Sequence, residues 1–184
     1  MKKFFALAAV LMLCGFCVAQ AKGGPKTVAQ ILDGGVTAIE TELVPAAEAM
    51  PEDKFGFAPT NGEFKGVRTF GQQVKHVAAV NYLVAGAILG EKPPVEYGGE
   101  NGPDSVKSKA DIMKFLKDSF AYAHKAVATI TADNSTASID SAFGDGKTTR
   151  LGMATVIAWH GFDHYGQMVE YLRMNGIVPP ASRN

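Results

Sequence analysis

The chain has 184 residues, of which 47% are hydrophobic, and its 18 basic and 18 acidic residues give a formal net charge of zero. This length suits a single domain with one hydrophobic core. The balanced charge and the lack of a basic run exclude the electrostatic footprint expected of a protein that binds nucleic acid or an anionic membrane surface.

The first segment, residues 1–21, has the layout of a secretory signal peptide. Lys2 and Lys3 provide a positive start, the apolar run "FFALAAVLMLCGFCV" follows, and Ala19-Gln20-Ala21 fits an A-x-A cleavage site. The apolar run is short for a membrane-spanning helix. We therefore expect cleavage after Ala21 and export of a soluble protein to the periplasm or the medium.

Cleavage would remove both cysteines of the chain, Cys14 and Cys17. The mature protein would then have no disulfide, no cysteine nucleophile and no cysteine-based zinc site. It would also carry 16 basic and 18 acidic residues, a net charge of −2. We expect residues 22–26 to form a flexible linker and residues 27–184 to form one domain.

Four amphipathic helices are predicted within this domain, separated by turn-rich segments. Apolar residues recur at helical spacing, and glycine or proline follows the predicted helix ends. Four long helices predict an all-α four-helix bundle, and the long connections indicate that at least one of them crosses over. A short strand or hairpin is predicted near residues 132–147. The predicted helices span residues 27–50, 69–89, 108–131 and 149–174.

Two histidines of the last predicted helix, His160 and His164, are four residues apart. At about 100° per residue they lie within about 40° of each other, on the apolar stripe of the helix. Asp163 lies on the flank of this stripe, where it would support an imidazole or meet solvent. Gln167 lies on the stripe itself and, like Asp163, is a candidate for orienting a water molecule.

The second predicted helix also has a histidine on its apolar stripe. His76 shares this stripe with Val80, Leu83 and Ala87. Gln72 precedes His76 by one turn on this face. We therefore expect His76 to meet His160 and His164 between two facing helices.

A single histidine on an apolar face is usually a neutral, hydrogen-bonded core residue, and a pair at this spacing is ambiguous. Three buried imidazoles are costly unless each has a partner, and one divalent cation satisfies all three. We therefore predict that His76, His160 and His164 bind a divalent metal such as Zn, Ni or Fe. Three histidine ligands leave coordination positions open, as in catalytic sites.

The other candidate residues are assigned structural roles. His124 is predicted to lie at the boundary of its helix's apolar stripe, and Trp159 to pack in the core or at an interface. Tyr165 and Tyr171 are predicted to pack, although Tyr171 lies on the histidine face. The H-E-x-x-H motif of metallopeptidases is excluded, because Gly161 stands where that motif needs glutamate.

The segments "FGQQVKHVAAVNYLVAGAILGEKPP", "SKADIMKFLKDSF" and "HGFDHYGQMVEYLRMNGIVPPASR" together resemble the DinB-like family, also described as DinB/YfiT-like metalloenzymes. The resemblance extends over roughly Val28 to Arg183. It implies a four-helix bundle with a long crossover and a metal held by His76, His160 and His164. It also implies homodimers in many members, and a thiol-dependent transferase or isomerase activity in some. It does not imply DNA binding.

These observations leave three functional interpretations. The first is a metal-dependent enzyme, either a hydrolase or a thiol-dependent transferase, with a small-molecule substrate or thiol as its partner. Export weakens the transferase version, because thiol cofactors are mainly cytosolic. The second is a secreted helical bundle that binds a metal or ligand without catalysis. The third is a metal-free bundle in which the histidines only pack.

Overall fold

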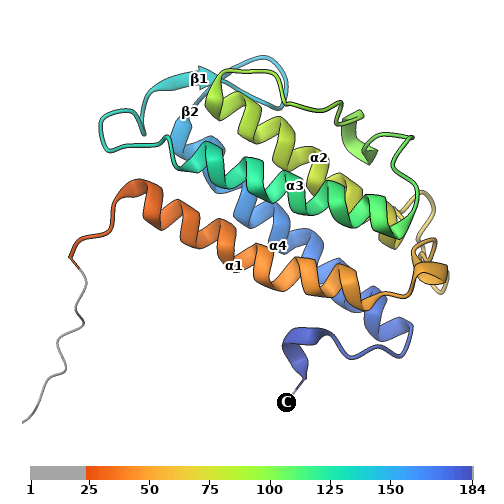
Figure 1. Cartoon of the computed structure of the whole chain (residues 1–184). Helices are drawn as coiled ribbons and strands as arrows, with labels where there is room; N and C mark the ends of the chain where they lie inside the picture. Colours follow the sequence, from red (N-terminus) through yellow and green to blue (C-terminus); the bar gives the residue numbers. More distant parts are fainter. Residues whose placement is uncertain (1–23, 184) are drawn as a thin grey trace, which may run out of the picture.

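The computed structural model describes residues 24–183, and the predicted signal peptide and its cleavage site lie outside this range. Within these residues the fold is built on four long helices (Figure 1), which confirms the predicted all-α bundle. A small antiparallel sheet of two strands, β1 and β2, precedes the last helix. The elements are α1 (Val28–Ala49), η1 (Glu52–Lys54), α2 (Phe70–Leu89), η2 (Gly99–Asn101), α3 (Lys109–Val127), β1 (Ser138–Asp140), β2 (Lys147–Thr149), α4 (Arg150–Met174) and η3 (Pro180–Ser182).

Each helix packs against two others, and α1 and α2 lie diagonally across the bundle because both contact α3 and α4. α2 and α3 run in the same direction, so the chain must return along the bundle between them (Figure 1). Residues 90–108 make this return and carry η2, which packs on α2. The predicted long crossover is therefore the connection between α2 and α3. α4 runs antiparallel to α2, as the bond from the Tyr171 hydroxyl to the Arg68 carbonyl shows.

The helix ends follow from the local sequence. Thr27 and Thr69 form complete capping boxes at the starts of α1 and α2. Gly90 ends α2 with a φ of 69°, in the left-handed region that glycine adopts without strain. α3 ends at Val127, earlier than the predicted residue 131. The side-chain amide of Asn134 explains this early end. Its oxygen accepts a hydrogen bond from a backbone N–H of the four residues that follow the helix, and its NH₂ group donates one to a backbone carbonyl of the same four residues.

Gly161 allows α4 to lie close to α1. A Cβ atom built on Gly161 would lie 2.5 Å from Cγ1 of Ile39, which is completely buried. A side chain there would force the side chain of Ile39 or α1 itself to move. The position that glutamate occupies in an H-E-x-x-H motif is thus a helix contact in this bundle.

The outer face of α4 exposes two aromatic side chains, Trp159 (59% exposed) and Phe162 (43% exposed). The prediction that Trp159 packs in the core is therefore wrong. Its packing at an interface stays a prediction, as does the homodimer. Among the helices within residues 24–183, none combines the length and the apolar character that a membrane span requires.

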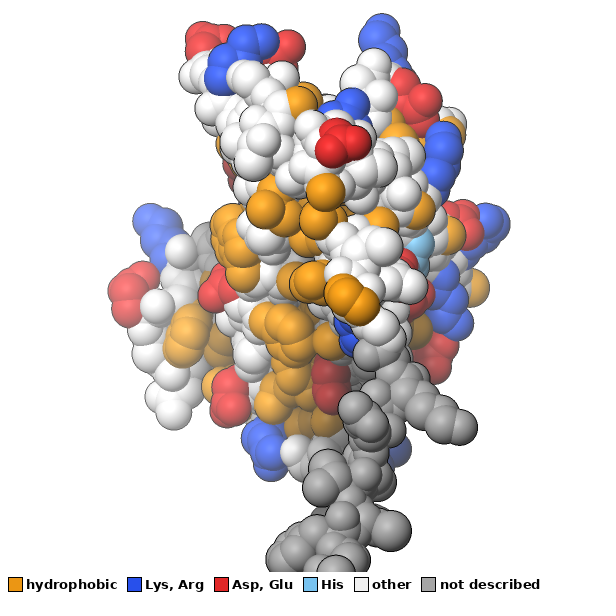
Figure 2. Space-filling model, turned by 90° about the vertical axis from the view of Figure 1, so that its left-hand side faces the viewer, with side chains coloured by type: hydrophobic (Ala, Val, Ile, Leu, Met, Phe, Trp, Pro, Cys, Tyr) orange, Lys and Arg blue, Asp and Glu red, His pale blue; other side chains and the backbone are white. Residues whose placement is uncertain are grey.

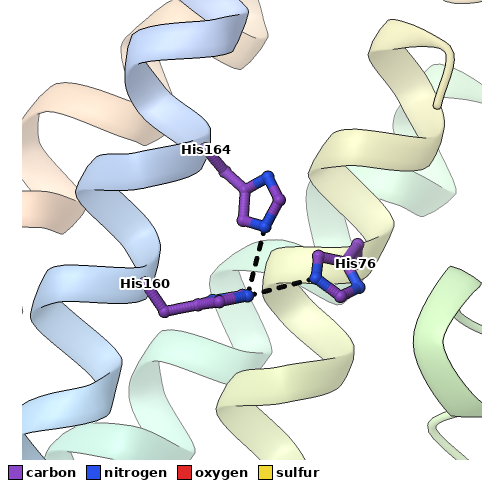
Figure 3. Close-up of side chains that lie close together, drawn as sticks. All are labelled: His76, His160 and His164. Carbon is purple, nitrogen blue, oxygen red and sulfur yellow. Dashed lines mark hydrogen bonds between the residues drawn. The ribbon is translucent and has the colours of Figure 1, made fainter. Parts of the chain in front are cut away.

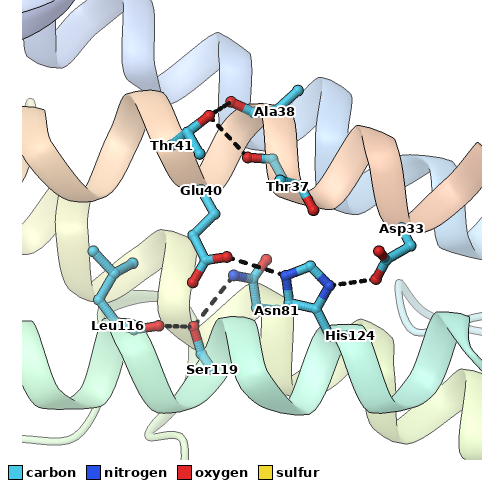
Figure 4. Close-up of polar contacts among 9 residues, drawn as sticks. All are labelled: Asp33, Thr37, Ala38, Glu40, Thr41, Asn81, Leu116, Ser119 and His124. Atoms are coloured by element: carbon cyan, nitrogen blue, oxygen red, sulfur yellow. Dashed lines mark hydrogen bonds and ion pairs between the residues drawn. The ribbon is translucent and has the colours of Figure 1, made fainter.

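His124 joins α3 to α1 at the edge of the core (Figure 4). Its Nδ1 lies 2.6 Å from Asp33, and its Nε2 lies 3.1 Å from Glu40. Partial burial lowers the pKa of His124, but the hydrogen bonds and negative charges of the two carboxylates outweigh this effect and raise the pKa above its ordinary value. The predicted boundary position of His124 is confirmed, and the residue acts as a bridge between two helices.

Replacing His124 with Gln should lower the free energy of unfolding more at acidic than at alkaline pH. The folded-state pKa is raised, so the contribution is fully present below the unfolded pKa of about 6.5 and is lost as pH rises through the folded value. We expect at most about 1 kcal/mol, because the site is partly solvated. Urea unfolding of both proteins from pH 5.5 to 8.5 measures the difference. The same substitution in an Asp33→Asn/Glu40→Gln background is the control and should show no pH dependence.

Candidate metal centre

The structure brings His76 of α2 together with His160 and His164 of α4 (Figure 3). The Nε2 atom of His160 lies 3.1 Å from that of His76 and 3.1 Å from that of His164. One ring nitrogen from each residue lies within 4.8 Å of the others. His76 and His164 are buried, and His160 is half-buried.

The outward-facing nitrogens of two of the rings have partners that fix the position of the proton. Nδ1 of His76 lies 2.5 Å from the backbone carbonyl of Glu100 in η2, and Nδ1 of His164 lies 2.6 Å from Oε1 of Gln73. A carbonyl oxygen only accepts, so each Nδ1 carries the proton and each Nε2 keeps a lone pair. Both lone pairs face the centre of the triad.

The orientation of Gln73 is set by a chain of hydrogen bonds that ends on Asp163. The amide of Gln167 donates to the carboxylate of Asp163 (3.2 Å), and its oxygen accepts from the amide of Gln73 (2.8 Å). This arrangement leaves Oε1 of Gln73 to accept from His164. Asp163 therefore supports an imidazole through two glutamines and makes no direct hydrogen bond to one.

Gln72, which was expected on the face of His76, is exposed and completes the capping box of α2 by accepting from the backbone N–H of Thr69. Gln73, which is 2% exposed, takes the position at the site instead. The spacing Thr69-x-x-Gln72 is the sequence signal that could have distinguished the two glutamines, because it predicts a capping role for the second residue.

All three imidazoles are held neutral. Burial, followed by the neighbouring histidines, lowers the pKa of His160 to about 3; burial and then His76 lower that of His164 to about 4. Burial also lowers the pKa of His76, against the opposing effect of its bond to Glu100. Neutral imidazole is the form that binds a metal ion.

The triad fits a divalent ion better than it fits hydrogen bonding among its members. Two bare lone pairs face Nε2 of His160, and one proton there could satisfy only one of them. Nitrogen ligands about 2.1 Å from one ion lie roughly 3.0 to 3.4 Å from each other, depending on the coordination angle. The two separations from Nε2 of His160, 3.1 Å each, fall in this range, and all three ligand nitrogens lie within 4.8 Å of one another. Nδ1 of His160 is buried and has no hydrogen-bond partner among the described residues.

A cavity of about 510 Å³ opens beside the triad, with His76 and His160 in its wall. It lies between α2, the crossover, and the connection from α3 to α4. Its lining is mostly apolar, and its acidic residue, Glu100, pairs its carboxylate with Arg68 at 3.0 Å. The remaining lining residues are Ala79, Val80, Leu83, Tyr97, Gly99, Ala142, Phe143 and Gly144.

The crossover is attached to α2 around the site by residues that sequence patterns did not reveal. Arg68 binds the side chains of Glu100 and Asn101, and Lys75 donates to the carbonyl of Pro103 at 2.7 Å. These bonds hold the carbonyl of Glu100 against His76. No sequence signal marks a backbone carbonyl as a partner of histidine.

The two tyrosines have structural roles. Tyr171 is buried, stacks edge-on against Phe57, and donates its hydroxyl to the carbonyl of Arg68 at 3.1 Å. Tyr165 is half-buried and donates to Glu42 of α1 at 3.0 Å. Both tyrosines pack as predicted, and the hydroxyl of Tyr171 is bound outside the triad.

The bundle, its crossover and the inward-facing triad define a class of helical proteins whose core can hold a metal. The chain belongs to the DinB superfamily, whose sequence profile matches residues 37–168. A crystal structure of a DinB-like protein from Bacillus cereus ATCC 10987 is similar in fold, with a TM-score of 0.64 and 16% sequence identity. The match covers 84% of this chain and 96% of that one. None of the curated proteins compared with the chain matches it.

Replacing Gln73 with Leu should weaken zinc binding about 10- to 100-fold, because His164 loses the acceptor that fixes its tautomer. Zinc affinity is measured by competition with a chromophoric chelator. Gln72→Leu is the matched control. It removes a capping bond and should lower the melting temperature slightly while leaving zinc affinity unchanged. Equal effects of both substitutions on affinity would contradict the assigned role of Gln73.

Proposed function

We propose that this protein is a metal-dependent enzyme that binds a divalent ion through His76, His160 and His164 and acts on a small molecule in the adjacent cavity. The observation that carries the proposal is the convergence of three Nε2 atoms, of which those of His76 and His164 present lone pairs, beside a mostly apolar cavity that His76 and His160 line. The alternative function is that of a helical bundle that binds a metal or ligand at the same site without turnover.

A divalent ion held there would supply Lewis acidity and concentrated positive charge. The residues around it provide orientation and exclude water. The Glu100 carbonyl and Gln73 hold two rings with their lone pairs inward. Val80, Leu83 and Ala142 give the cavity an apolar wall, which strengthens electrostatic interactions inside it.

Thiol-dependent transfer fits this site better than hydrolysis. Glu100, the acidic residue of the cavity wall, is engaged by Arg68, so no carboxylate within the described lining is positioned as a general base. A thiol has an ordinary pKa of about 8.5, and a bound divalent ion would lower it further, so a thiol would ionise there without a general base. The thiol would come from a co-substrate, because Cys14 and Cys17 are the only cysteines of the chain and lie within the predicted signal peptide. Hydrolysis is the alternative, and predicted export to a compartment poor in small thiols favours it.

Replacing His160 with Ala should abolish metal binding, whereas His124→Ala should retain it, because His124 binds Asp33 and Glu40 on the other side of the bundle. Elemental analysis should find about one divalent ion per chain in the wild type and in His124→Ala. Metal at about a hundred times its dissociation constant adds about 2.7 kcal/mol of stability. Chelation should therefore lower the melting temperature of these two proteins by roughly 5 to 10 °C and leave that of His160→Ala unchanged. Equal, negligible metal in all three would support the metal-free interpretation.

Adding 2-mercaptoethanol to cobalt-substituted protein should produce a new near-ultraviolet absorption band from sulfur-to-cobalt charge transfer. His160→Ala should show no such band. An unchanged wild-type spectrum combined with ester or phosphoester hydrolysis above the buffer rate would contradict thiol transfer and identify a hydrolase. An unchanged spectrum with no turnover on either kind of substrate would identify the binding bundle.

A further inference from the structure

Two cavities meet along one face of α2. The cavity beside the triad shares Leu83 and Ala142 with a second cavity of about 620 Å³ between the end of α2, the β1–β2 hairpin and the start of α4. His76, Val80, Leu83, Ala87 and Gly90 follow each other at helical spacing along this face, and all five line one cavity or both. At 1.5 Å per residue they cover about 21 Å. We call this continuous hollow the α2 groove.

The middle of the α2 groove is apolar. Val80 is 6% exposed, and Leu83, Ile139 and Ala142 are half-buried around it. Phe143 is 53% exposed at the rim of the cavity beside the triad. Figure 2 faces the end of the molecule that carries the hairpin, and it shows a band of hydrophobic side chains bordered by charged ones.

The end of the α2 groove far from the triad carries an excess of positive charge. Its two acidic residues are already paired: Glu91 with Lys125 at 2.9 Å, and Asp140 with Lys147 at 2.5 Å. Lys92 and Arg150 line the same cavity and make no ion pair within residues 24–183. An anionic group placed there would gain two charge-assisted contacts without displacing an existing pair.

We propose that the α2 groove binds an elongated small molecule that is anionic at one end and apolar in the middle. The anionic group lies at Lys92 and Arg150, and the apolar segment lies on Leu83 and Ala142. The other end of the molecule reaches the triad and carries the reacting group. The placement of the reacting group at the triad rests on the proposed metal-dependent function, whereas the binding of the anionic and apolar parts does not.

Calorimetric titration of zinc-loaded protein with decane-1-sulfonate tests the anionic end, because a sulfonate is a weak metal ligand. Wild type should bind, and Lys92→Gln/Arg150→Gln should bind about tenfold more weakly or worse. Lys54→Gln/Lys65→Gln is the matched control, since it removes two exposed lysines at the opposite end of the bundle and should change affinity less than about twofold. Equal losses in both double variants would overturn the assignment, because they would indicate nonspecific attraction to basic residues.

Hexane-, octane- and decane-1-sulfonate test the apolar middle. Affinity should rise about two- to fourfold for each added methylene, as expected for an alkyl chain that leaves water. Ala142→Trp places a large side chain where the two cavities meet and should remove this dependence while keeping the far end intact. Chain-length dependence that survives in Ala142→Trp, or that is missing from wild type, would overturn the groove as the binding site.

His160→Ala separates failure of this inference from failure of the proposed function. The variant should lose zinc yet bind decane-1-sulfonate as wild type does, because the sulfonate lies at the far end. If His160→Ala loses sulfonate binding as well, the sulfonate lies at the metal and the anion assignment is overturned. If wild type binds sulfonate but no metal, the proposed function fails while the groove assignment stands.

Discussion

The contact between α2 and α4 is the constraint on which the rest of the structure depends. It places three ring nitrogens from two helices around one point, and those of His76 and His164 direct their lone pairs at Nε2 of His160 from 3.1 Å each. Such lone pairs repel unless a cation or a proton lies between them, and burial lowers the pKa of all three rings. The Nδ1 atoms of His76 and His164 are hydrogen-bonded to other partners. The Nε2 atoms of these two rings therefore stay directed at the centre of the triad.

The topology of the bundle explains how this pair of helices becomes a site. Because α2 and α3 run parallel, the chain must travel back along the bundle between them, and it does so across the face of α2 that carries His76. This return supplies the carbonyl that orients His76 and one wall of the cavity. Arg68 and Lys75 attach it to α2. A simple up-and-down bundle would leave His76 open to solvent.

Periodicity predicted the helices and the histidines that converge, since both depend on which residues share a face of a helix. It could not choose between Gln72 and Gln73, which lie on either side of the direction of His76 and differ by one helical position. The choice depends on the cap at Thr69, which occupies Gln72. The Glu100 carbonyl could not be predicted at all, because every residue carries one and only the path of the crossover brings this one to His76. The early end of α3 depends likewise on one side chain, Asn134, seven residues beyond the helix.

The charge balance of the site links the triad to the α2 groove. The three candidate ligands are neutral, and Asp163 reaches His164 only through two glutamine amides. Glu100 is turned toward Arg68, so an ion held by the triad would keep most of its positive charge for whatever enters from the cavity. Lys92 and Arg150 provide positive charge at the far end of the α2 groove as well, and an apolar stretch lies between them and the triad. A short anion would not reach from Lys92 and Arg150 to the triad, and an uncharged apolar chain would gain nothing from these two basic side chains. The length of a molecule and its anionic end together would therefore determine whether the groove selects it.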